Sequence, residues 1–352
     1  MSKWKRKKKL WKVKKTLKGN FPKKKNNRIV NNNSSKICIR ESAKSFNIKD
    51  YNKNVPEVFS IVENTEETLC FFNDVVAEIK QKHYKEKFFF NFKNVKKVTI
   101  DALMYLLAIM QNIYSEDNVL NQSFSGNHAD DSDVNECISE SGFYDYVEIT
   151  VPVTKTRGGK KIQISDGDNV DARLVKSICD FVNESCKTEK RFTQDLYEVL
   201  IEVMANTVQH AYSVDELWEK HNWYIFIEDK EEYIQFTFLD IGEGIPKTIN
   251  KKFHEKIKDI MIRNDADYII SALNGEFRSQ TKLESRGNGL PTVKKYGERK
   301  EVEEMHIISG RGVCIFESNK ELITKKIIKN RLDGTIFYWK IKKSDIGRNF
   351  IK

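Results

Sequence analysis

The stretch LYEVLIEVMANTVQHAY, residues 196–212, decides how the chain is interpreted. Its apolar residues recur at spacings of three and four, which predicts a helix with one face in a core. Glu202, Asn206 and His210 follow one another at steps of four and form a separate polar stripe. Asparagine is unfavourable inside a helix because its amide competes for backbone hydrogen bonds, so Asn206 needs an explanation. The helix alone fits an ordinary solvent-facing stripe as well as a binding site.

A second stretch, FTFLDIGEGIP at residues 236–246, is an apolar strand that ends at Asp240. Gly242 and Gly244 follow, and glycine permits positive φ angles and a close approach of the backbone to a ligand. A carboxylate at the strand end is positioned to accept hydrogen bonds, as an adenine amino group requires. A plain strand, turn and proline is the other interpretation of this stretch.

Two further glycine signals lie downstream. In SRGNGLPT, residues 285–292, Gly287 and Gly289 come just before an expected helix. Backbone N–H groups in such a turn, together with the helix dipole, form an anion site suited to phosphate. In DGTIFYW, residues 333–339, Gly334 and Thr335 open the last expected strand. Each signal is weak when taken alone.

Together, and in this order, the four elements resemble the GHKL superfamily of DNA gyrase, heat-shock chaperones, histidine kinases and MutL. Glu202 and Asn206 match its E-x-x-x-N box, DIGEGIP its D-x-G-x-G box, RGNGL its second glycine box and Gly334-Thr335 its final G-T element. The resemblance covers residues 165–345. It implies an α/β sandwich in which helices cover one face of a mixed sheet. A P-loop is absent, because Gly159-Lys160 lacks the upstream glycine and the following Ser or Thr.

The resemblance also implies roles for single residues around ATP and Mg²⁺. Asn206 would coordinate Mg²⁺, and Glu202 would act as general base toward the γ-phosphate. Asp240 would bind the adenine amino group, and residues 247–285 would form a lid over the nucleotide. The remaining residues expected around the nucleotide are His210, Gly242, Gly244, Gly287, Gly289, Leu290 and Thr335.

The sequence that follows Glu202 is most similar to that of the anti-sigma-factor serine kinases, in which N-x-V-x-H-A-Y follows the glutamate. A sensor histidine kinase is disfavoured, because no dimerisation helix carrying a histidine followed by Glu or Asp precedes residue 196. Residues 50–155 alternate strands with helices, which predicts a small α/β domain. Its Thr99-Ile100-Asp101 helix entry resembles a STAS domain, the fold of the partners of such kinases. An unrelated α/β module is the alternative.

Several element boundaries can be predicted from local patterns. In the first domain we expect a strand near 58–62, a helix from Asn64 or Thr65, a strand over 88–92 and an Asp101-capped helix to 113. Residues 115–135 are expected as a loop. In the second domain we expect helices over 170–182, 193–212 and 248–273 and strands over 223–228, 234–239, 305–309, 313–318 and 334–341.

Charge is distributed unevenly along the 352 residues, whose formal net charge is +10. Residues 1–28 carry twelve Lys, two Arg and no acid, which leaves 47 basic against 51 acidic residues in the remainder. Residues 1–35 are therefore expected to be a basic disordered arm. Its interpretations are a solubilising tail, a contact to nucleic acid through residues 1–28 or a contact to an anionic membrane surface.

Other features favour a cytoplasmic location. The N-terminus lacks the apolar region of a secretory signal, and no apolar run approaches the ~18 residues of a membrane helix. The six scattered cysteines are expected to be reduced, and no histidine has zinc-ligand spacing.

Three functions follow from these features. The first is an ATP-binding regulatory protein, either a Mg²⁺-dependent ATPase or a serine kinase acting on a protein partner. The second is an ATP-switched dimerising clamp, in defence or repair, that contacts nucleic acid through the basic arm. The third is a non-enzymatic nucleotide-binding scaffold, against which Glu202 argues because a binder needs no base. A homodimer remains open.

Overall fold

The structure is a computed structural model that describes residues 37–39, 50–81, 87–113, 123–149, 160–187, 193–210, 222–257, 264–277, 289–318 and 323–346. All of them belong to one compact unit, residues 36–352. The predicted basic arm lies outside the described residues, so its partners stay predictions. None of the helices in the described ranges is long and apolar enough to cross a bilayer.

The N-terminal module, residues 37–149, is an α/β structure in which every strand pair is parallel. A three-stranded sheet has the order β2-β4-β6, and β1–β7 and β3–β5 form two small pairs. The strands are β1 (Ile37–Ile39), β2 (Asp50–Asn54), β3 (Val58–Phe59), β4 (Lys87–Asn91), β5 (Lys97–Val98), β6 (Ser123–Gly126) and β7 (Val147–Ile149). The helices are α2 (Thr65–Gln81), α3 (Ile100–Ile113), α4 (Ser132–Glu140) and the 3₁₀ turn η1 (Phe143–Asp145).

Two expectations for this module were wrong. The predicted loop at 115–135 contains β6 and the start of α4, because Phe124 is the only apolar residue of β6 and gives no alternation to detect. Asp101 does not cap its own helix. Its buried carboxylate accepts hydrogen bonds from the backbone N–H groups of Ile61 (2.6 Å) and Val62 (3.2 Å), and so holds the turn between β3 and α2.

The C-terminal region, residues 160–346, contains one five-stranded sheet with the order β11-β12-β10-β9-β8. Its strands are β8 (Lys161–Gly167), β9 (Trp223–Asp229), β10 (Tyr233–Asp240), β11 (Val302–Glu317) and β12 (Thr324–Lys342). Its helices are α5 (Ala172–Cys186), α6 (Gln194–His210), α7 (Gly244–Ile257), α8 (Asp265–Leu273), α9 (Gly289–Gly297) and α10 (Lys343–Ile346).

The expectation of a mixed sheet was wrong, since all four strand pairs are antiparallel. Short hairpins join β9 to β10 and β11 to β12, and strands joined in this way must run in opposite directions. The two strands expected at 305–309 and 313–318 are one strand, β11, with register shifts between Ser309 and Gly312.

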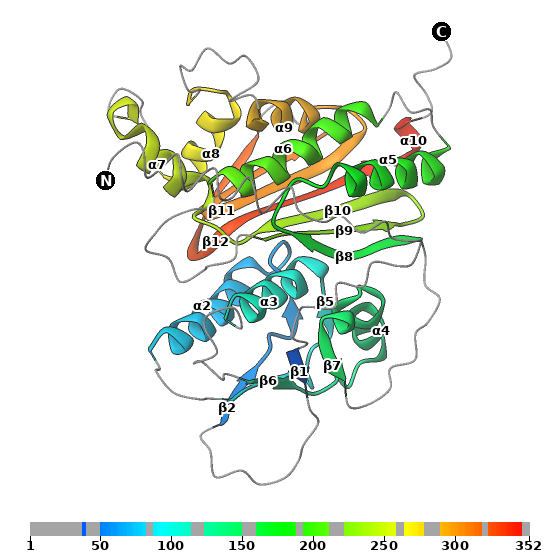
Figure 1. The fold of residues 1–352 in the computed structure, drawn as a ribbon, viewed down its shortest axis with the longest axis vertical. Helices are drawn as coiled ribbons and strands as arrows, with labels where there is room; N and C mark the ends of the chain where they lie inside the picture. The colour runs from blue at the N-terminus through cyan, green and yellow to red at the C-terminus, as the bar shows by residue number, and fades with distance from the viewer. Residues whose placement is uncertain are drawn as a thin grey trace, which may run out of the picture. The chain divides into compact units, whose positions relative to one another are not determined.

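Both faces of this sheet are buried, rather than one as expected. The helix face packs with α5, α6, α8 and α9, and Figure 1 shows α5, α6 and α9 along this side of the strands. It consists mainly of Trp223, Ile225, Ile227, Phe236, Phe238, Phe337 and Trp339. The module face packs in one core with α2 and α3 of the N-terminal module. It consists mainly of Tyr224, Phe226, Leu239, Ile241, Ile336 and Tyr338.

Candidate functional site

Helix α6 brings two of the predicted site residues against the start of α9. Glu202 and Asn206 lie one turn apart on α6, and Gly289 is the first residue of α9. A Cβ added at Gly289 would lie 2.7 Å from Glu202 Oε2 and 3.1 Å from Asn206 Nδ2. Only glycine therefore fits here without displacing these side chains. The first and third motifs, more than 80 residues apart in the chain, meet at this point.

The polar groups of this cluster have unusual surroundings. The buried Asn206 Nδ2 has no hydrogen-bond partner among the described residues. An unsatisfied buried donor costs free energy, so a ligand that supplies an acceptor would stabilise it. Burial raises the pKa of Glu202 above its ordinary value, and the negative charge of Glu198 raises it further. A carboxylate with a raised pKa accepts a proton more readily near neutral pH.

A second cluster forms where β10 ends. Asp240 is the last residue of β10 and pairs with Thr335 on β12 and with Trp223 on β9. Burial raises the pKa of Asp240 to about 7, although a hydrogen bond from the backbone N–H of Thr335 lowers it. This carboxyl group therefore changes charge near physiological pH.

Two glycines let the backbone close around Asp240. Gly334 has φ of 101°, and a Cβ there would lie 2.0 Å from the carbonyl oxygen of Asp240. Gly244 has φ of 76°, and a Cβ there would lie 2.7 Å from Ser309 Oγ. Both positions need glycine for its backbone conformation and for its lack of a side chain.

Ser309 on β11 joins these motifs and is a residue that the sequence analysis missed. It is fully buried. Its hydroxyl accepts a hydrogen bond from the N–H of Ile245 (2.9 Å) and donates one to the carbonyl of Gly334 (2.9 Å). Its Oγ also lies 3.1 Å from the Thr335 hydroxyl. The only signal in the sequence is a small polar residue directly after Ile307 and Ile308 in an expected strand.

The structure describes the other predicted residues incompletely. The side chain of His210 and all of Gly287 lie outside the described residues. Gly242 is buried, and Leu290 packs against the core of the helix face. The predicted lid contains α7 and α8, and residues 258–263 and 278–285 of it are not described. The two clusters lie on elements that share one core, which includes Val203 of α6, Val293 of α9 and Phe238 of β10.

The residues present fit a nucleotide with Mg²⁺. Protein-bound Mg²⁺ keeps several waters and is commonly held by one or two protein groups plus substrate phosphates. The side chain of Asn206 lies beside the N-terminus of α9, where its Oδ1 would be the atom that ligates Mg²⁺ and its unpartnered Nδ2 could donate a hydrogen bond to a phosphate oxygen. No group of three or more His, Cys, Asp or Glu side chains gathers as a metal site in the part of the chain that the structure describes.

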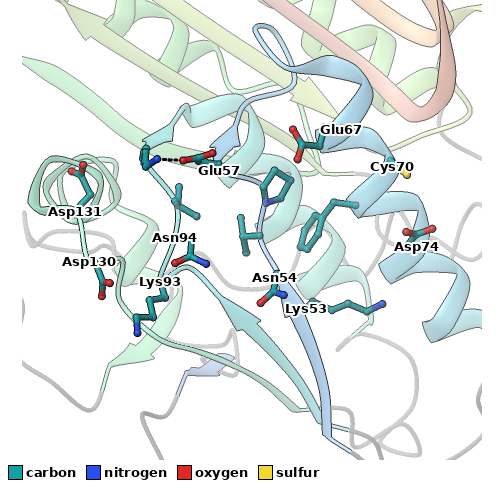
Figure 2. Close-up of a pocket in the computed structure, with 15 residues that line it drawn as sticks. Lys53, Asn54, Glu57, Glu67, Cys70, Asp74, Lys93, Asn94, Asp130 and Asp131 are labelled. Atoms are coloured by element: carbon teal, nitrogen blue, oxygen red, sulfur yellow. Dashed lines mark ion pairs between the residues drawn. The ribbon is translucent and has the colours of Figure 1, made fainter.

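A separate opening of about 960 Å³ lies in the N-terminal module (Figure 2). Its walls include the chain just after β2 and β4, and ligands of open α/β sheets bind beyond such carboxyl ends. Asn91 joins these strand ends by hydrogen bonds to Asn54 (3.0 Å) and Asn127 (2.8 Å). The polar lining is Lys53, Asn54, Glu57, Glu67, Asp74, Lys93, Asn94, Lys96, Asp130 and Asp131. None of the predicted nucleotide residues lines this opening.

No protein-family model and no curated protein matches the chain.

Proposed function

We propose that residues 160–346 form a nucleotide-binding domain of the GHKL type, which binds ATP with Mg²⁺ and transfers its γ-phosphoryl group. The acceptor is water or a hydroxyl group of a partner protein. The convergence of motifs supports the proposal most strongly: Gly289 contacts Glu202 and Asn206, and Gly334 contacts Asp240. Four short patterns spread over more than 130 residues would not be expected to meet in pairs if they were unrelated turns.

In this proposal, different residues bind the adenine end and the phosphate end of the nucleotide. Asp240, when ionised, accepts a hydrogen bond from the adenine amino group, and Thr335 and Gly244 form the surrounding wall. Asn206 and the backbone at the start of α9 bind the phosphate end. When bound, Mg²⁺ neutralises phosphate charge, which is the main requirement of phosphoryl transfer.

Glu202 is the proton acceptor in this proposal. As the acceptor oxygen forms its bond to the γ-phosphorus, the bond from that phosphorus to the bridging oxygen of ADP breaks. The proton of the acceptor hydroxyl or water passes to the Glu202 carboxylate. The raised pKa of Glu202 suits this role, because the group holds a proton more firmly than an exposed glutamate does.

Binding and turnover by three variants test the proposal. Asp240→Asn should abolish ATP binding measured by calorimetry, because an amide cannot replace the carboxylate without presenting its own donors to adenine. Glu202→Ala should keep binding and lower Mg²⁺-dependent turnover by at least about 100-fold, the usual contribution of a general base. Glu184→Ala, an exposed glutamate on the neighbouring helix α5, should change neither.

The outcomes separate the alternatives. Wild-type protein that does not bind ATP would refute the proposal. Equal loss of binding and turnover in Glu202→Ala would refute the role of Glu202. With labelled ATP, transfer to an added partner protein would identify a kinase, and release of inorganic phosphate alone would identify an ATPase.

A further inference from the structure

One set of polar contacts between the N-terminal module and the sheet lies on a segment of β12, residues 329–333, and another joins Glu140, Ser141 and Tyr146 to β8. Glu66, in the first turn of α2, accepts hydrogen bonds from the backbone N–H groups of Lys329 (2.8 Å) and Asn330 (3.3 Å). The Asn330 side chain donates in return to the carbonyl of Glu66 (3.1 Å). The start of α2 therefore fixes the backbone of β12 at two successive residues.

Tyr105 of α3 holds the other end of the same segment. Its hydroxyl accepts a hydrogen bond from the backbone N–H of Asp333 (3.1 Å). The side chain is only 2% exposed, and its ring packs edge-on against Phe72 with 4.8 Å between the centroids. Burial raises the pKa of Tyr105, so the phenol stays neutral. Because the ring is fixed by packing, the neutral hydroxyl accepts this hydrogen bond at one position and so fixes the position of the backbone N–H group.

The residues that follow this segment belong to the candidate nucleotide pocket. Gly334 packs directly on the carbonyl of Asp240, and Thr335 pairs with Asp240 across the sheet. Gly334 also accepts the hydrogen bond from Ser309. Displacement of Asp333 by a fraction of an ångström would therefore move the backbone that surrounds Asp240.

We propose that Tyr105 and Glu66 are positioning residues for the adenine end of the pocket, through which the N-terminal module sets the affinity for ATP. The inference rests on the proposed function, because it assigns a regulator to that same pocket. Linkage requires the effect to be reciprocal: ATP binding should also stabilise the contact between β12 and helices α2 and α3.

Tyr105→Phe tests the proposal, because it removes only the hydroxyl and keeps the ring. Tyr224→Phe is the matched control: its buried hydroxyl donates to Gln111 of α3 (2.6 Å), so it also joins the module to the sheet, but on β9. Tyr105→Phe should raise the Kd for ATP about fivefold, the effect of losing one typical hydrogen bond. Tyr224→Phe should leave Kd within about twofold even if it destabilises the fold equally.

Hydrogen exchange gives a readout that a purely structural role would not move. ATP should slow exchange of the α3 amides in wild-type protein and in Tyr224→Phe, but much less in Tyr105→Phe. Equal Kd values for wild-type protein and Tyr105→Phe, with the same ATP-induced protection of α3, would overturn the inference and leave the proposed function intact. A wild-type protein that does not bind ATP would overturn both.

A second variant keeps the test decisive if Tyr105→Phe does not fold. Glu66 is exposed, so Glu66→Ala should fold and should raise the Kd for ATP about threefold through the loss of its contacts to Lys329 and Asn330. Glu67→Ala, the exposed neighbour whose carboxylate bonds Asn64 instead, is its control. Identical affinities in these two variants would also count against the proposal.

Discussion

The two faces of the five-stranded sheet are buried by different means. On the helix face, aromatic rings stack on one another: Phe236 lies 4.8 Å from Trp339 with a 3° angle between the rings, and Trp223 stacks on Phe238. On the module face, apolar packing is joined by hydrogen bonds that Tyr105 and Glu66 accept from the backbone of β12 and that Tyr224 donates to Gln111. The first face depends on the area and shape of apolar groups, and the second also depends on the direction of single polar bonds.

Because of this difference, we expect the helix face to determine the stability of the fold and the module face to determine the position of the backbone at the candidate site. Close-packed rings have few alternative arrangements, so the helix face is expected to carry most of the free energy of unfolding. A hydrogen bond contributes much less but specifies the position of a backbone atom. We therefore expect variants of the helix face to unfold the protein and variants of the module face to change the pocket.

The largest expected effect is at Trp339. Trp339→Ala removes a fully buried ring and should lower the free energy of unfolding by about 3–5 kcal/mol, measured by urea titration. Trp339→Phe keeps the stack on Phe236 and removes an indole N–H that has no hydrogen-bond partner among the described residues, so it should cost less than about 1.5 kcal/mol. If Trp339→Ala cost less than Tyr105→Phe, the contrast between the faces would be wrong.

Gly334→Ala should act on both stability and the pocket. A Cβ 2.0 Å from the Asp240 carbonyl, at φ of 101°, adds a collision to backbone strain, and the free energy of unfolding should fall by about 2–3 kcal/mol. ATP affinity should fall as well, in the same calorimetric assay. Gly275→Ala has φ of 76° at the end of α8, outside the β10–β12 pairing, and controls for strain alone. A Gly334→Ala protein with normal ATP affinity would argue against close packing at Asp240.

Ser309→Ala should have a smaller effect on stability. It leaves the Ile245 N–H and the Gly334 carbonyl without their partner, which costs about 1–3 kcal/mol. Ser60→Ala is a matched control, because this buried hydroxyl also accepts a backbone N–H, that of Glu63, but lies in the N-terminal module. Both variants should lose stability, and only Ser309→Ala should weaken ATP binding. If Ser309→Ala and Ser60→Ala bound ATP with equal affinity, Ser309 would have only a structural role.

The smallest expected effect is a pH dependence of ATP binding. In the proposed site the ionised form of Asp240 binds adenine, and its pKa is raised to about 7, so affinity should decrease as the pH falls through 7. Proton linkage predicts a roughly eightfold higher Kd for adenosine at pH 6.0 than at pH 7.5. Adenosine is the probe because, unlike ATP, it carries no phosphate groups that would titrate in this pH range. The same raised pKa means that stability falls as the pH rises from about 4 toward 7, because over this range the folded state still holds the proton that the unfolded chain has released. If the Kd for adenosine did not change between pH 6.0 and pH 7.5, the pKa of Asp240 would lie outside this range.

Local patterns predicted most of the helices because their evidence is local, but the single helix expected over 248–273 was wrong: α7 ends at Ile257 and α8 begins after an extended Asn264. Thr65 and the apolar residues behind it predicted α2, and the periodicity from Leu196 predicted α6. The β6 strand was missed because Ser123–Gly126 has a single apolar side chain and is specified by its partner β4. Strand direction was also mispredicted, because the apolar sequence of a strand such as β10 does not indicate whether its partner strands run parallel or antiparallel to it.

The candidate site follows the same rule. Glu202, Asn206, Asp240 and Gly334 could be predicted because each is an unusual residue in its local context. Ser309 could not, since a buried serine in a strand is unusual only when Gly334 and Ile245 are seen beside it. The continuous apolar run WYIFI of β9, residues 223–227, does contain the sign of a second covered face, because a strand with one solvated face alternates.

The order of the strands has a consequence for synthesis on the ribosome. β12 lies between β11 and β10 in the sheet, but it follows all four other strands in the chain. Until β12 has left the exit tunnel, β10 lacks its neighbour and Asp240 lacks Thr335. The N-terminal module emerges first and can fold ahead of the sheet that it covers. A chain stalled before residue 324 would therefore lack the pairing of Asp240 with Thr335, and we expect it not to bind the nucleotide proposed for the completed site.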